Sequence, residues 1–115
     1  MHELGIVFHI IKQVEEVCVK NKVSSVASVT MQFGEVSGIV PDYLTDCWKW
    51  ACEKSEYLKG TRLLYETLPA VTMCNSCSKT YSTIQYGKKC PYCNSDDTYL
   101  QSGNEIIIKE IAVEE

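Results

Sequence analysis

Two closely matched cysteine pairs constrain this chain more than any other feature of its sequence. Cys74-Asn75-Ser76-Cys77 and Cys90-Pro91-Tyr92-Cys93 are both Cys-x-x-Cys sequences, and twelve residues separate them. Each pair can wrap a tight turn around one ion and supply two thiolates, and two facing turns complete the tetrahedron that Zn²⁺ favours. Because four thiolates leave no open coordination position, the pattern predicts a structural zinc site rather than a catalytic one.

Two other kinds of chemistry use the same residues. A Cys-Pro-x-Cys turn also suits four-thiolate iron in a rubredoxin-like electron carrier. The pair Cys90 and Cys93 alone is similar to a thioredoxin-type redox dithiol. A second pair nearby favours ligation over thiol exchange, and zinc is favoured over iron because nothing else in the sequence indicates redox work.

The remaining cysteines and the chain start indicate where such a protein resides. Seven cysteines is an odd number and their spacing is uneven, which argues against a disulfide framework. Cys18, Cys47 and Cys52 fall on or beside helical stripes, where they are expected to be small buried hydrophobic residues. The sequence shows neither a signal peptide nor an apolar run long enough for a membrane span, so we expect a soluble, cytoplasmic protein with no membrane partner.

Periodicity predicts an α+β fold with a small mixed three-stranded sheet and two helices. The first helix is expected over residues 4–20, and the second begins at Pro41 and buries a stripe. Three strands are expected near residues 28–33, at 62–68 and at 105–113, the last in a well-covered position. The predicted apolar stripes are Leu4, Val7, Phe8, Ile11, Val14 and Cys18 in the first helix, and Leu44, Cys47, Trp48 and Ala51 in the second. Trp50 lies off its stripe and marks a candidate contact surface.

A change of composition after Val71 predicts a separate module. From residue 71 to 102 the apolar periodicity lapses, and about thirty residues of this composition cannot build much of a core unaided. We therefore expect a zinc-ribbon domain at 71–102, with strand-like segments at 81–85 and 98–101, inserted into a domain made of 1–70 and 103–115.

The charge balance bears on nucleic-acid binding. Eleven Lys and Arg against fifteen Asp and Glu give a formal net charge of −4. A zinc-ribbon accessory protein that binds DNA or RNA is an alternative function, but it would need a basic stripe with interleaved aromatic residues. We therefore expect no nucleic-acid partner.

The first three residues form a second candidate metal site. The Met1 amine, the amide nitrogen that follows it and the His2 imidazole are three nitrogen donors that can close chelate rings around one ion. Such a nearly planar set favours Ni²⁺ or Cu²⁺ over Mg²⁺ or Ca²⁺. Glu3 can supply a further donor or favour the start of the helix electrostatically. On residues alone a histidine near a chain start is more often a surface residue, and His9 is read in that way as well.

The motifs in their order resemble a known family. Met1-His2-Glu3 before a helix, Gly34-Glu35-Val36-Ser37-Gly38 leading to Pro41-Asp42, Gly60-Thr61, the two cysteine pairs and an isoleucine-rich final strand are similar to the HypA/HybF hydrogenase nickel-incorporation proteins. The resemblance extends over essentially the whole chain.

The resemblance implies a nickel metallochaperone that is not an enzyme. It implies transferable Ni²⁺ held by His2 and backbone nitrogens with Glu3 adjacent, and structural zinc held by Cys74, Cys77, Cys90 and Cys93. The implied partners are a HypB-type GTPase and the large subunit of [NiFe]-hydrogenase. Some members of the family also serve urease, and a homodimer is a further expectation.

Overall fold

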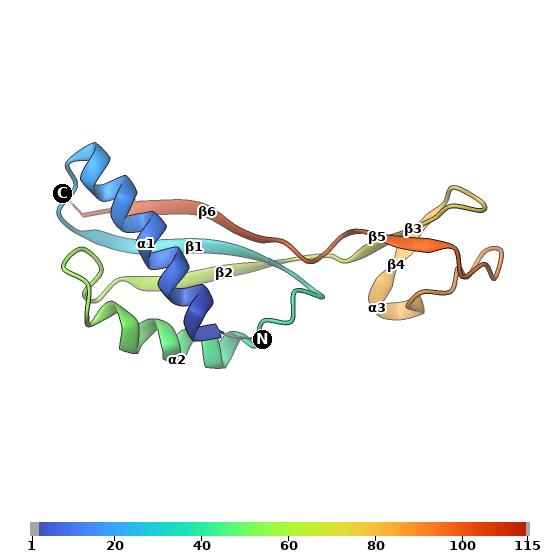
Figure 1. Ribbon diagram of the computed structural model, residues 1–115, viewed down its shortest axis with the longest axis horizontal. Coiled ribbons are helices and arrows are strands. Elements are labelled where there is room, and N and C mark those ends of the chain that lie inside the picture. Colours follow the sequence, from blue (N-terminus) through green and yellow to red (C-terminus); the bar gives the residue numbers. More distant parts are fainter. Residues whose placement is uncertain (1–2, 115) are drawn as a thin grey trace. The chain divides into compact units, whose positions relative to one another are not determined.

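A computed structural model describes residues 3–114 and shows an α+β chain (Figure 1). Nine elements follow one another along it: α1 (Glu3–Asn21), β1 (Val26–Gly34), α2 (Pro41–Cys52), β2 (Arg62–Leu68), β3 (Val71–Cys74), β4 (Thr80–Ser82), α3 (Thr83–Tyr86), β5 (Thr98–Ser102) and β6 (Ile106–Val113). They form two three-stranded sheets, ordered β2-β1-β6 and β4-β3-β5. Among the described residues, no helix is both long and apolar enough to cross a membrane.

The chain packs as two compact units. One contains residues 3–31, 39–66 and 107–114 of the described chain and is called the helix unit below. The other contains residues 32–38 and 67–106 and is called the cysteine unit. The domain boundaries expected at residues 70 and 103 remain predictions.

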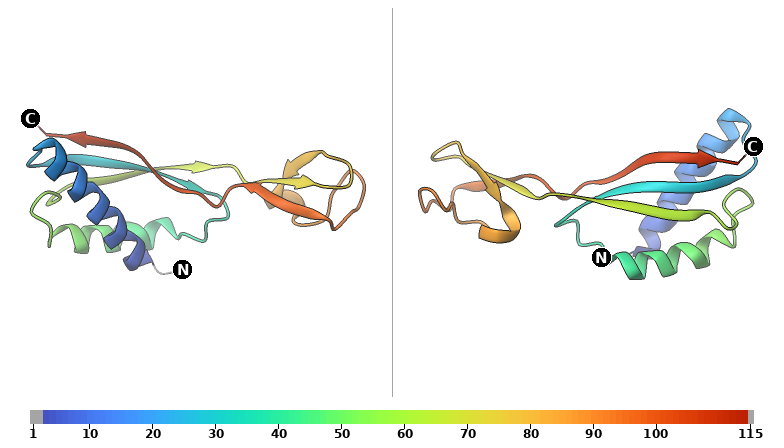
Figure 2. Two further views of the ribbon diagram at one scale, coloured as in Figure 1. Left: turned by 45° about the horizontal axis from the view of Figure 1, so that its top comes forward. Right: turned by 180° about the vertical axis from the view of Figure 1, so that it is seen from behind.

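The sheet β2-β1-β6 is mixed, as expected. β6 runs antiparallel to β1, because Gly34 N–H donates to the Glu105 carbonyl at one end and Glu114 N–H to the Ser25 carbonyl at the other. β1 and β2 run parallel and are joined by α2, the crossover that such a pair requires. Both helices lie on the same face of this sheet (Figures 1 and 2).

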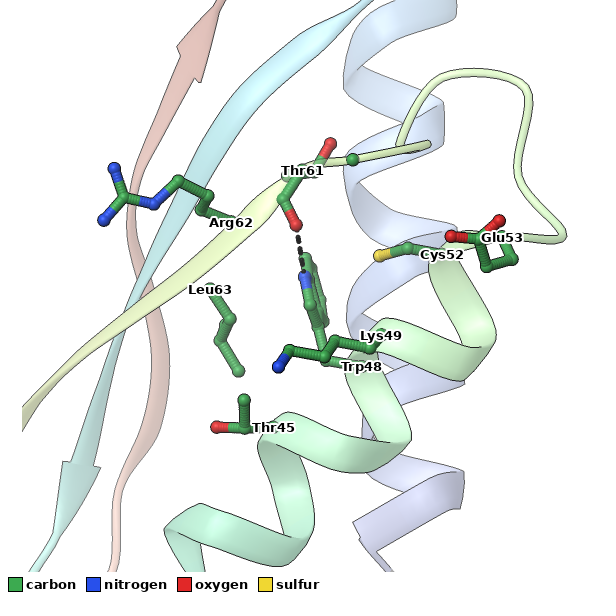
Figure 3. A pocket seen from close by; sticks show the side chains of 9 residues that line it. Thr45, Trp48, Lys49, Cys52, Glu53, Thr61, Arg62 and Leu63 are labelled. Atoms are coloured by element: carbon green, nitrogen blue, oxygen red, sulfur yellow. Dashed lines mark hydrogen bonds between the residues drawn. The ribbon is translucent and has the colours of Figure 1, made fainter.

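The core of the helix unit lies between that face and the helices. Its largest fully buried side chains include Trp48, Ile10, Met31, Leu44, Leu58, Val7, Val14, Val26 and Val29. The predicted stripe of α2 is confirmed, since Leu44, Cys47, Trp48 and Ala51 are all buried. Trp48 also donates its indole N–H to the Thr61 carbonyl at 2.9 Å, beside a cavity of about 310 Å³ between α2 and the start of β2 (Figure 3).

Two expectations about burial are wrong. Leu4 and Phe8 belong to the predicted stripe of α1 but are 38% and 43% exposed, because α1 directs Ile10 into the core and leaves these two side chains at its outer edge. The final strand was expected to be well covered, yet Ile106 and Ile107 are 40% and 41% exposed. β6 is an edge strand and pairs only with β1.

The cysteine unit is a small antiparallel sheet with long turns. β3 pairs with β4 through Thr72 and Tyr81 and with β5 through Met73 and Tyr99. The strand expected at 81–85 ends at Ser82. The next four residues form α3 instead, because the Ser82 hydroxyl accepts the Gln85 N–H and caps a helical turn.

The loop Gly34–Gly38 is bonded into the cysteine unit. Glu35 N–H donates to the Leu68 carbonyl, and the Glu35 carboxylate accepts the Ala70 N–H at 2.6 Å. Val36 N–H donates to the Gly103 carbonyl at 2.8 Å. A Cβ at Gly34 would overlap that same Gly103 backbone, so this close crossing of two chain segments requires glycine.

Candidate metal centre

The four cysteines of the two Cys-x-x-Cys pairs converge on one point. Their four Sγ atoms all lie within 4.8 Å of one another. The Sγ atoms of Cys74 and Cys93 are 3.6 Å apart, and those of Cys77 and Cys90 are also 3.6 Å apart. A zinc ion with bonds of about 2.3 Å to four sulfurs at tetrahedral angles requires S···S edges of about 3.8 Å. The cluster therefore has the size of a four-thiolate zinc site.

Each pair is held by the same backbone turn. The first cysteine donates its N–H to the carbonyl five residues later, and its own carbonyl accepts the N–H of the residue four positions later. These bonds are Cys74 N to Lys79 O and Ser78 N to Cys74 O in one turn, and Cys90 N to Ser95 O and Asn94 N to Cys90 O in the other, at 2.9 to 3.0 Å. Ser78 and Asn94 have φ of 61° and 63°, the left-handed conformation that each turn requires.

Polar side chains join the two turns outside the sulfurs. Ser76 and Ser95 share a hydroxyl–hydroxyl hydrogen bond of 2.8 Å. Asn75 donates its side-chain amide to the Asp97 carboxylate at 3.1 Å and its backbone N–H to the Asp97 carbonyl at 2.9 Å. Sequence reasoning did not identify these partners, although Asn75 and Ser76 are the two residues between the cysteines of the first pair.

The electrostatics of the cluster call for a cation. The N–H groups of Cys77 and Ser76 donate to the Cys74 sulfur and lower the pKa of its thiol to about 7. The Ser95 N–H has the same lowering effect on Cys93, but desolvation and the neighbouring sulfurs, Cys74 first, outweigh it and raise the pKa of Cys93 to about 12. Four thiolates this close repel one another, so all of them ionise together only around a positive ion.

Few other side chains pack directly against the sulfurs. Cys74 and Cys90 are fully buried and Tyr81 is 6% exposed, and these three form the hydrophobic cluster, with Cys77 packed against it. Tyr81 donates its hydroxyl to the Gly87 carbonyl at 3.0 Å. An ion among the sulfurs would therefore lie within this small cluster.

The other cysteines are placed as expected. Cys18, Cys47 and Cys52 are buried among apolar side chains of the helix unit. Within residues 3–114, the four-sulfur cluster is the one group of three or more potential metal ligands.

The predicted nickel donors Met1 and His2 lie outside the described residues. Their neighbour Glu3 is described and is only 3% exposed. Its carboxylate Oε2 accepts the N–H of Val40 at 3.0 Å, at the residue that caps α2. His9 is exposed on α1.

Comparison with known proteins places the whole chain in one group. Residues 1–113 match the family model described as hydrogenase/urease nickel incorporation, metallochaperone, hypA. The hydrogenase maturation factor HypA of Geobacter metallireducens is 36% identical over 115 residues, covering 99% of this chain and 100% of that protein. HypA of Geotalea uraniireducens is 34% identical, with the same coverage.

Solved structures share the fold. The solution structure of the Ni metallochaperone HypA from Helicobacter pylori superimposes with a TM-score of 0.74 at 23% identity, covering 98% of this chain and 97% of that one. Sequence, fold and four-cysteine site thus agree, and the chain belongs to the HypA family of nickel metallochaperones for hydrogenase maturation.

Proposed function

We propose that this protein carries Ni²⁺ at its N-terminus for delivery to [NiFe]-hydrogenase and holds Zn²⁺ permanently among Cys74, Cys77, Cys90 and Cys93. The observation that carries the proposal is the family match over residues 1–113, together with a sulfur cluster closed by four protein ligands. A closed site retains its ion, so a transferable cargo needs a second, accessible site.

The nickel donors are the His2 imidazole, the Met1 amine and backbone nitrogen. Glu3 is adjacent in sequence, but its carboxylate is buried against the Val40 N–H, so we assign it to anchoring the chain next to the site. A terminal site can be approached from several sides, and a recipient's donors can take the ion stepwise. The chain acts as a carrier rather than as an enzyme.

Nickel affinity should fall as pH decreases. The imidazole must be neutral and the amine and amide must lose protons before they coordinate, so protons compete with the metal. Release therefore becomes easier at lower pH, whereas the sulfur-bound zinc serves only to fold the cysteine unit.

The partners follow from family membership. We propose that this chain works with a HypB-type GTPase and delivers nickel to the hydrogenase large subunit. Urease is a second candidate recipient, since the description of the matching family includes it.

Nickel titration of the zinc-loaded protein with a free N-terminus tests the site. Nickel and zinc contents are measured separately for the native chain, for His2→Ala and for a chain with two extra residues before Met1. We expect both changes to abolish stoichiometric nickel binding and to leave one zinc per chain.

His9→Ala is the matched control, because His9 is the only other histidine and is exposed on α1. It should bind nickel as the native chain does. Full nickel affinity in His2→Ala would refute the N-terminal site. Iron in the purified protein, visible as a thiolate-to-iron absorption band, would refute the zinc assignment.

A further inference from the structure

Strand β5 is an edge of the sheet in the cysteine unit and has no charged residue to block further pairing. The sheet order is β4-β3-β5, so one side of β5 faces no other strand among the described residues. Edge strands of natural proteins are commonly protected by charged side chains or proline. The edge strands of the other sheet follow this rule, since β2 carries Arg62 and Glu66 and β6 carries Lys109 and Glu110. In contrast, β5 has the sequence Thr-Tyr-Leu-Gln-Ser and is open to an added strand.

The register of β5 shows which of its backbone groups point outward. Asn75 N–H donates to the Asp97 carbonyl, and Met73 lies opposite Tyr99 two residues further along the same ladder. Hydrogen-bonded pairs alternate with non-hydrogen-bonded pairs in an antiparallel ladder, so both of these pairs are hydrogen-bonded. The next residue, Leu100, therefore directs its N–H and its carbonyl away from β3. These two groups can pair with an incoming extended chain.

A groove of about 440 Å³ lies beside the same residue within the cysteine unit. Its apolar walls include Val36, Tyr99 and Leu100, all of them partly exposed. A volume of this size lies within the range of pockets that hold ligands. The groove can therefore receive an apolar side chain.

The polar groups of the groove are largely committed to the unit itself. The hydroxyls of Thr72 and Thr83 share a hydrogen bond of 2.6 Å, and the Thr98 hydroxyl donates to the Lys88 carbonyl at 2.7 Å. Lys88 and Asp96 also line the groove, and their opposite charges balance. An uncharged, apolar side chain consequently fits this lining better than a charged one, which would gain no net attraction.

We propose that β5 and the adjacent groove bind an extended segment of another protein, with an apolar residue opposite Leu100. Directly opposite residues of an antiparallel pair lie on the same face of the sheet, so the residue that bonds to the Leu100 backbone places its side chain at the groove. Backbone hydrogen bonds then supply affinity and the groove supplies selectivity. A second copy of β5 would not fill the groove, because Leu100 is one of its walls. The inference does not depend on the proposed nickel site.

A short peptide tests the proposal on the full, zinc-loaded chain. The probe is acetyl-Thr-Val-Phe-Val-Thr-amide, and binding is followed by NMR titration. We expect saturable binding and slower exchange of the Leu100 amide proton, which gains a carbonyl acceptor. Methylation of the phenylalanine nitrogen removes the donor to the Leu100 carbonyl and should weaken binding at least about tenfold. Methylation of the valine nitrogen that follows it is the matched control, because this nitrogen points away from β5 and the affinity should change less than about twofold.

A pair of protein variants gives an independent measurement. Leu100→Asp removes a wall of the groove and puts a charge on the edge strand, and should weaken peptide binding at least about tenfold. Ile84→Asp makes the same kind of change at an exposed apolar residue of α3, and should bind the peptide as the native chain does. Both variants should retain one zinc and the native amide spectrum away from the substitution.

Three results would overturn the proposal. The first is the absence of saturable binding at millimolar peptide, and the second is equal weakening by the two methylated peptides. The third is native affinity in folded Leu100→Asp. A sedimentation mass that rises with protein concentration without peptide, and does so no longer in Leu100→Asp, would also overturn it, because the edge would then belong to a second copy of the chain.

Discussion

The two units of this molecule are stabilised in different ways. The helix unit buries Trp48, Ile10, Met31, Leu44 and several valines between two helices and a sheet. In the cysteine unit, which also buries Phe33 and Ala70, the hydrophobic cluster at the metal site consists of Tyr81 and three of the cysteines. Hydrophobic burial is distributed over many side chains, whereas a metal site concentrates stability in a few ligands. Single substitutions should therefore lower the stability of the helix unit in small steps. In the cysteine unit, loss of one metal ligand should remove most of the stability at once.

The largest effect is expected from breaking the sulfur cluster. Cys74→Ser removes a fully buried ligand, and structural zinc sites contribute about 10–16 kcal/mol of apparent binding free energy that also serves as folding free energy. We expect zinc loss and collapse of amide-exchange protection across residues 67–106, with α1 and α2 still protected. A chelator should reproduce this pattern in the native chain.

Cys47→Ala is the control for that experiment. Cys47 is buried in the helix unit as a small apolar residue, so the variant should retain one zinc. Protection of the cysteine unit in metal-free Cys74→Ser would show that this unit folds without its metal.

The next effect is expected in the helix unit. Trp48→Ala removes a side chain that is 1% exposed and its hydrogen bond to Thr61, and should lower the free energy of unfolding by about 3–5 kcal/mol. Urea unfolding followed by helical circular dichroism measures the loss, and zinc content should remain one per chain. Trp50→Ala, at a half-exposed position on the same helix, should lower the free energy of unfolding far less. Equal losses would show that burial does not determine stability here.

The difference between the units also decides what could be predicted from sequence. Metal ligation depends on residue identity and spacing, so Cys74, Cys77, Cys90 and Cys93 could be grouped from the sequence alone, and the structure brings them together. The buried stripe of α2 could also be predicted, because the spacing of its four apolar residues marks one face of a helix and all four are buried. The exposure of Leu4, Phe8 and Ile107 could not be predicted from the sequence. It depends on which element packs against each side chain, and local periodicity does not contain that information. The bonds of Asn75 and Ser76 join residues about twenty positions apart and needed the folded turns.

The hydrogen bonds around the sulfurs should have a smaller effect on zinc affinity than the sulfurs themselves. Asn75→Ala removes the amide that reaches the Asp97 carboxylate, and outer partners of metal ligands typically change metal affinity by about 10–100-fold. Competition with a chromogenic zinc chelator measures this change. Asp96→Ala is the neighbouring control, with an exposed carboxylate, and should leave the affinity within about twofold. An unchanged zinc affinity in Asn75→Ala would mean that the sulfurs alone determine how tightly the metal is bound.

Alkaline pH should weaken the helix unit through Cys52. Burial, followed by the carboxylates of Glu53 and Glu15, raises the pKa of this thiol from 9.0 to about 12. Since the folded pKa lies above the unfolded one, the full contribution is present below pH 9 and is lost as pH rises toward 12. Stability should fall by at most about 1.4 kcal/mol per pH unit in that range. Urea unfolding at pH 9 and pH 10 should show a shallower decline in Cys52→Ala, and identical slopes would exclude this thiol as the cause.

The smallest effect is expected where opposite charges meet in water. Lys109 Nζ lies 2.7 Å from the Glu66 carboxylate between the two edge strands, and both side chains are 45% exposed. Exposed pairs of this kind contribute about 0–1 kcal/mol because water screens them and both side chains lose freedom. A double-mutant cycle with Glu66→Gln and Lys109→Met should therefore give a coupling energy below about 1 kcal/mol that decreases further in 0.5 M salt. Only a desolvated ion pair reaches a coupling energy above about 2 kcal/mol. Such a value would therefore mean that a single charged contact contributes strongly to the stability of the helix unit, as the metal site does in the cysteine unit.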